Sequence, residues 1–158
     1  MATVKILNQA PGYGGSSPYG NTSTNKFTLE TTATGAVKNG SSTAALAIAD
    51  EVVLGVMDAG FRLDDMQIVI STAMTPLVTA SLGFKYVDGV DSAAVPQDAA
   101  YFGTGLVLNA AGRLRNATTK AIVTLPKPAN LVLTLAGAAN AKVSYLDFVI
   151  KGELIGPK

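Results

Sequence analysis

Apolar and polar residues alternate in short stretches along this chain, and turn-forming residues separate one stretch from the next. In one stretch, Met66, Ile68 and Ile70 share one face of an extended chain, and the residues between them share the other. The same period of two recurs at 130–136 and at 142–154. This period is typical of a β-strand with one buried face, so it restricts the chain to folds built from sheets.

Other segments have strand-like composition without a long helical pattern between them. They lie at 26–35, 51–57, 77–87, 106–115 and 120–125. Together the segments predict about eight to ten strands at a spacing of roughly ten residues. The sequence therefore predicts an all-β fold, an antiparallel β-sandwich or jelly roll. The residues after Pro96 are the one place where a single helical turn is compatible with the sequence.

The first part of the chain has a different composition. Residues 8–26 are rich in Gly, Ser, Asn and Thr and contain Pro11 and Pro18. Such a segment buries too little apolar surface to offset the entropy of compact folding. We therefore expect two parts, an extended N-terminal arm at 1–25 and a sandwich domain at 26–158.

Two tyrosines, Tyr13 and Tyr19, lie within this arm. A tyrosine buries a large ring and keeps a polar tip, which makes it a good anchor on a partner surface. An extended arm of this length reaches about 80 Å. We expect the arm to become ordered on a neighbouring protein, with Tyr13, Tyr19, Pro11 and Pro18 as its contact residues. A free tail is the alternative.

The chain contains no histidine and no cysteine. It therefore lacks the side chain that titrates near neutral pH and the thiolate that serves as nucleophile or soft metal ligand. Asp64, Asp65 and Lys85 are the residues that a small hydrolase would have to use, but adjacent aspartates on a strand point to opposite faces, and we expect Asp64 and Asp65 to lie in a turn instead. No catalytic, cofactor-binding or metal-binding residue is expected, and no cofactor.

Three aspartates, Asp88, Asp91 and Asp98, fall in the turn-rich segment 88–104. Carboxylates are ligands for calcium, but this spacing does not match an EF-hand loop and no glutamate closes it. The sequence leaves open whether a cation binds there.

The charge and hydropathy of the chain limit the classes of partner that it is expected to bind. The 12 basic and 11 acidic residues form no basic run, so nucleic-acid binding is not expected. No apolar run of about 18 residues is present, so no membrane span is expected either. Apolar residues nevertheless occur on both faces of the segments 51–57 and 142–154. We expect a homo-oligomer or a partner to cover the outer face, since large exposed apolar patches mark interaction sites.

The stretch 47–104 resembles head decoration, or cement, proteins of tailed bacteriophages. The resemblance rests on the turn Asp58-Ala59-Gly60, the aspartates before the Ile68–Ile70 strand, the segment Ser81–Gly89 and the aromatic pair Tyr101-Phe102. It covers about 60 of the 158 residues as a pattern of small features. The family supplies no catalytic residues.

The resemblance implies a virion structural protein on the outer surface of an icosahedral capsid, assembled in the host cytoplasm. Such proteins form trimers or dimers and stabilise contacts between major capsid protein subunits. We expect a homotrimer rather than a dimer, with the major capsid protein as partner. The alternative is a carbohydrate- or receptor-binding β-sandwich module of a phage tail or fibre.

Overall fold

The computed structural model describes residues 1–6, 22–116 and 118–156. Strands make up its regular structure: β1 Thr3–Lys5, β2 Thr22–Glu30, β3 Glu51–Met57, β4 Phe61–Thr72, β5 Thr79–Tyr86, β6 Asp98–Val107, β7 Gly112–Arg115, β8 Val123–Thr124, β9 Ala129–Ala136 and β10 Tyr145–Leu154. Within these described residues there is no helix, and so none that is long and apolar enough to cross a membrane.

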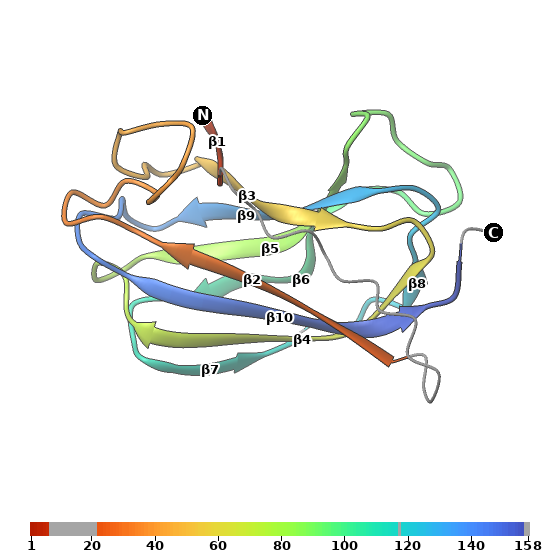
Figure 1. The fold of residues 1–158 in the computed structure, drawn as a ribbon. Coiled ribbons are helices and arrows are strands. Elements are labelled where there is room, and N and C mark those ends of the chain that lie inside the picture. The colour runs from red at the N-terminus through yellow and green to blue at the C-terminus, as the bar shows by residue number, and fades with distance from the viewer. Residues whose placement is uncertain (7–21, 117, 157–158) are drawn as a thin grey trace.

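The strands form two sheets that lie one on the other (Figure 1). The first sheet has the order β1-β3-β9-β5-β6, and the second has the order β2-β10-β4-β7 with β8 paired to β4. All pairs are antiparallel except β1 with β3. The prediction of an all-β antiparallel sandwich of the jelly-roll type is confirmed.

The core lies between the sheets and follows the alternation in the sequence. In β9 the inward side chains of Leu131, Leu133 and Leu135 are almost completely buried, and Phe148 and Ile150 of β10 face them from the other sheet. Each fully buried side chain of this size contributes about 1.5–3 kcal/mol relative to exposure. The sandwich is thus held by residues that the period of two identifies in advance.

The predicted turn at Asp64 and Asp65 is wrong, because both residues lie inside β4. A register shift against β10 occurs between Lys151 and Gly152, so β4 carries an extra residue there. Leu63 and Met66 both point into the core, and the two aspartates between them are half-buried. The bulge therefore places both carboxylates on the outer face, where strict alternation would separate them.

The N-terminal segment is only partly separate from the sandwich. Thr3–Lys5 pairs with β3, and Val4 belongs to the core. Residues 22–25 extend β2 along β10 as far as Glu153. The expected boundary at residues 25 and 26 therefore falls inside β2. Pro11, Tyr13, Pro18 and Tyr19 lie outside the described residues.

The helical turn considered after Pro96 does not form, because β6 begins at Asp98. Tyr101 and Phe102 enter the core from this strand. The pairing of β5 with β6 passes from Leu82–Gly103 directly to Phe84–Asp98, so the first residues of β6 bulge strongly. A Cβ atom on Gly83 would lie 2.0 Å from the Asp98 carbonyl oxygen, which requires glycine at this close approach.

The outer apolar residues have different environments on the two sheets. Val53 of β3 and Val132 of β9 pair with each other on the outer face, and both are buried. On β10 the outer side chains of Tyr145 and Val149 remain exposed or half-exposed. Val53 and Val132 are thus already covered, and these two residues give no argument for self-association.

Candidate interaction surfaces

The two ends of the sandwich differ in the residues of their connections (Figure 1). The end at the right of the figure holds the long 87–97 loop between β5 and β6 and the segment 125–128. We call it the charged end, because Asp88, Asp91 and Lys127 lie in these connections.

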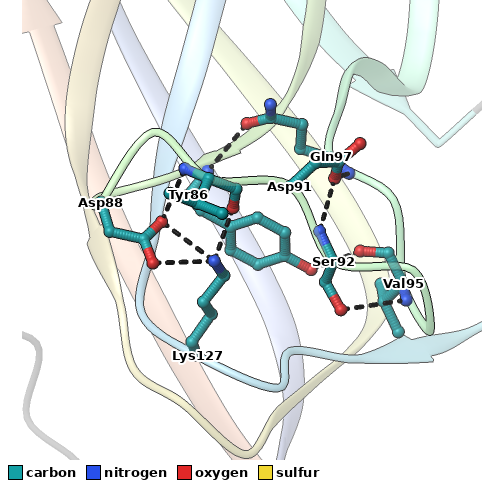
Figure 2. Close-up of polar contacts among 8 residues, drawn as sticks. Tyr86, Asp88, Asp91, Ser92, Val95, Gln97 and Lys127 are labelled. Atoms are coloured by element: carbon teal, nitrogen blue, oxygen red, sulfur yellow. Dashed lines mark hydrogen bonds and ion pairs between the residues drawn. The ribbon is translucent and has the colours of Figure 1, made fainter.

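The 87–97 loop is held by its own hydrogen bonds (Figure 2). The Asp91 carboxylate accepts the backbone N–H groups of Ser92 and Gln97 at 2.8 Å and 2.7 Å. The Tyr86 hydroxyl donates to the Val95 carbonyl oxygen, and the Gln97 side-chain oxygen accepts the Tyr86 N–H at 3.3 Å. The second half of the loop is thereby tied to Tyr86 of β5, so the loop has a defined shape.

Lys127 closes the base of this loop. Its ammonium donates to both carboxylate oxygens of Asp88, at 2.7 Å and 3.0 Å, and to the Val90 carbonyl oxygen at 2.5 Å. The same ammonium lies 4.6 Å from the centre of the Tyr86 ring. The bond from Lys127, with the Val90 N–H as a second donor, holds the pKa of Asp88 below its ordinary value. Burial raises the pKa of Tyr86.

The three aspartates considered as cation ligands each bind a different group. Asp88 binds Lys127, Asp98 binds Lys120, and Asp91 accepts backbone N–H groups. Burial acts to raise the pKa of Asp98, but the Lys120 ammonium and a backbone N–H outweigh it, so the pKa lies below its ordinary value. No three acidic side chains of the described residues gather closely enough to hold a metal ion. The geometry of these aspartates therefore gives no support for a cation site.

Of the residues considered for a hydrolase, Lys85 lies far from Asp64 and Asp65 in the fold. Lys85 forms an ion pair with Glu51 on the outer face of the first sheet. Asp64 binds Arg62, with bonds of 2.6 Å and 2.9 Å, on the outer face of the second sheet, and Asp65 contacts Arg115 there at 3.2 Å. Each carboxylate is bound to an arginine, and the sandwich core separates both from Lys85.

A shallow hollow of about 340 Å³ lies beneath the 87–97 loop, lined in part by Phe84, Tyr101 and the Asp98–Lys120 pair. Sugar sites present an aromatic ring face to the ligand. Here Phe84 and Tyr101 are buried and pack against each other edge to face, with ring centres 5.5 Å apart. The hollow therefore offers no exposed ring for stacking.

The opposite end contains long stretches of chain without charge. Four stretches, 39–49, 66–84, 99–112 and 128–141, contain no Asp, Glu, Lys or Arg. Each of the last three makes its turn at this end, between β4 and β5, after β6, and after β9. The fold thus brings uncharged segments that are distant in sequence to the same end of the molecule.

The turn between β4 and β5 lies at this end and contains a strained residue. Thr75 to Val78 form a β-turn in which the Val78 N–H donates to the Thr75 carbonyl oxygen at 3.2 Å. Pro76 takes the second position, and Leu77 takes the third with a φ of 69°. This type II position favours glycine or asparagine, and a bulky residue there is an outlier. Leu77 is also 72% exposed, so core packing does not explain the choice of leucine.

Neighbouring residues fix this turn in place. The side-chain oxygen of the buried Asn140 accepts the Thr75 N–H at 3.1 Å and the Thr75 hydroxyl at 3.2 Å. Gly137 packs so tightly that a Cβ atom on it would lie 2.1 Å from the Leu77 carbonyl oxygen. The turn is therefore rigid, although its leucine side chain lies in solvent.

Further apolar side chains extend from Leu77 along the end of the first sheet. Thr79 pairs with both Val107 and Ala136, and the Ala49 N–H donates to the Leu135 carbonyl oxygen, which brings Ile48 alongside. Val107 and Ile48 are 46% and 55% exposed, and Ala136 is exposed as well. We call the set Ile48, Leu77, Val107 and Ala136 the uncharged rim.

Sequence reasoning did not identify the rim. It used Pro76 only as the end of a strand. The Thr-Pro-Leu-Val order between two strands does predict a turn with proline in its second position. This order of residues does not reveal that the uncharged stretches 39–49, 99–112 and 128–141 come to the same end of the fold.

No protein-family model matches the sequence, and no curated protein matches it. The fold does have relatives among solved structures. A chain in the capsid of Ralstonia phage GP4 is 15% identical, with a TM-score of 0.59 over 88% of this chain and 87% of that one. A chain in the capsid asymmetric unit of cyanophage Pam1 is also 15% identical, with a TM-score of 0.56 over 92% of this chain and 91% of that one. Since the paired shares are nearly equal, each matched chain has about the length of this one.

Proposed function

We propose that this chain is a non-enzymatic virion structural protein of the decoration, or cement, type. It binds the outer surface of an icosahedral phage capsid and stabilises contacts between major capsid protein subunits. The observation that carries the proposal is the fold shared over nearly the whole chain with chains of similar size in two phage capsids.

The side-chain chemistry supports this function. The titratable groups considered for catalysis or metal binding already have partners, either in ion pairs such as Lys85 with Glu51 and Asp64 with Arg62 or, for Asp91, in backbone N–H groups. The described surface therefore suits contact with another protein better than turnover of a substrate. The buried rings of Phe84 and Tyr101 give the carbohydrate-binding alternative no comparable support.

The mechanism is multivalent clamping. A homotrimer offers several copies of the same modest contact to neighbouring shell subunits, and the later contacts form within one complex at high effective concentration. The arm adds reach, with Tyr13 and Tyr19 as anchors and Pro11 and Pro18 limiting the conformations that must be ordered. Shell subunits that are joined in this way separate less readily on heating.

The test uses phage heads assembled without this chain, to which the purified protein is added. We expect the protein to pellet with the heads and to raise the temperature at which they release their DNA. If the intact protein does not bind the heads, or binds without changing the release temperature, the proposed function is wrong.

A double variant, Tyr13→Ser with Tyr19→Ser, tests the arm in the same assay. We expect weaker binding to the heads and an unchanged melting temperature of the free protein. Tyr145→Ser is the matched control, because Tyr145 lies exposed on the outer face of β10. If the double variant binds as tightly as this control, the arm is not an anchor.

A further inference from the structure

We propose that the uncharged rim is the surface through which copies of this chain contact one another, with Leu77 at its centre. This inference deepens the self-association that belongs to the proposed function. The test of this inference needs no capsid, so the inference and the proposed function can each fail without the other.

Leu77 combines two energetically unfavourable features. It holds a left-handed backbone conformation that disfavours a bulky side chain, and it leaves that apolar side chain in solvent. Backbone strain of this kind persists where the surroundings impose it, and it clusters at functional sites. Ala49, the residue beside Ile48, is a second non-glycine residue with a positive φ, 66°, at the same rim. Neither position requires these residues for packing, so their use there points to an external contact.

The turn that carries Leu77 is also rigid. Pro76 restricts the backbone before Leu77, Asn140 holds Thr75, and Gly137 lies against the Leu77 carbonyl group. A side chain on a fixed turn loses little conformational freedom when it is buried at an interface. Leu77 therefore has the properties of a preorganised apolar anchor.

The absence of charge on the rim favours a second copy of the chain as the partner. Near the axis of a symmetric oligomer a residue meets its own copy, so every charged residue there faces a like charge. The rim side chains carry no charge, and the Asp50 carboxylate, which follows Ala49 in the sequence, is buried and binds the N–H groups of Ala2 and Ala47. The charged end, in contrast, would place Asp88, Asp91 and Lys127 opposite themselves. The rim is thus complementary to a second copy of itself.

The experiment is sedimentation velocity of the full chain over a series of concentrations. We expect the wild-type protein to sediment as an oligomer. Leu77→Asn removes the apolar side chain and suits the left-handed conformation, so we expect at least about a tenfold loss in the association constant. At concentrations at which both proteins are monomeric, the melting temperature of the variant should equal or exceed that of the wild-type protein, whereas the loss of a leucine that the fold requires would lower it. Val90→Asn is the matched control, since Val90 is 62% exposed at the charged end.

A second variant, Val107→Asp, places a charge on the rim. We expect it to dissociate the oligomer, and added salt to restore part of the association by screening the repulsion. The proposal is overturned if the wild-type chain is monomeric up to its solubility limit, in which case another protein is the occupant of the rim. It is also overturned if Leu77→Asn associates as strongly as Val90→Asn.

Discussion

The charged end and the uncharged rim are built on the same sandwich but are stabilised differently. At the charged end, Asp91 and Lys127 bind backbone groups and a carboxylate, so the long loop is tied by contacts that lie in solvent. At the rim, the buried Asn140 holds the turn from inside, and the side chain of Leu77 is left free on the surface.

The two ends therefore differ in which side chains they leave available to a partner. Polar side chains that bind each other at the charged end leave few groups available to a partner. A polar residue buried behind the rim fixes the turn without using the outer surface. The comparison predicts that substitutions behind the rim affect the stability of the whole sandwich, whereas substitutions at the charged end have local effects.

The largest effect is expected for Asn140→Ala. The Asn140 amide group donates to the Thr31 hydroxyl at 3.1 Å and to the Lys142 carbonyl oxygen at 3.0 Å, and its oxygen accepts two bonds from Thr75. The substitution removes these hydrogen bonds and takes away the partner of the Thr75 N–H, so we expect the free energy of unfolding to fall by about 3 kcal/mol. Urea denaturation measures this. Asn130→Ala on the outer face of β9 is the control, and an equal loss in both variants would contradict the role of Asn140.

A smaller effect is expected for Asp91→Ala at the charged end. The variant loses two hydrogen bonds to the N–H groups of Ser92 and Gln97, both of which become accessible to water. We expect the free energy of unfolding to fall by only about 1 kcal/mol. Amide hydrogen exchange should become faster in the 87–97 loop and stay unchanged at 73–78. Faster exchange across the whole protein would show that the loop is not a separate unit.

The smallest effect is a local response to acid. Because the pKa of Asp88 lies below its ordinary value of 3.8, the contact with Lys127 contributes stability that is complete above pH 3.8. That contribution is lost as the pH falls through the lowered pKa. Amide chemical shifts of Gly89 and Val90 should titrate with a midpoint below 3.8, whereas those of Thr75 and Val78 at the other end should stay constant.

Lys127→Met is the control for this titration. Removing the ammonium takes away the main cause of the lowered pKa, so the midpoint should move up toward the ordinary value. A midpoint that does not change in this variant would mean that another group sets the pKa of Asp88.

Much of the sandwich was predictable because its core strands follow a strict alternation. The segments that became β9 and β10 show their buried face directly in the sequence, as Leu131 and Phe148 illustrate. Residues 22–25 gave no such pattern. They are polar and lie on an edge strand, and their pairing with β10 is a tertiary contact that composition does not encode.

The surface features were harder to predict. The bulge at Asp64 and Asp65 breaks the alternation, so the sequence could not show that both carboxylates share one face. Pro76 predicts a turn, but Leu77 occupies a conformation that intrinsic preference disfavours, so local rules do not predict the type II turn that forms there. The rim also depends on which connections meet at one end, and only the strand order determines that.

We propose that this chain covers and joins other proteins and that its own copies meet at the uncharged rim. A cryo-electron microscopy reconstruction of phage particles that contain the chain tests it most directly. The account predicts sandwiches on the outside of the shell, with Leu77 of neighbouring copies close together at a symmetry axis. Isolated copies with Leu77 in solvent, or particles without the sandwich on their outer surface, would contradict it.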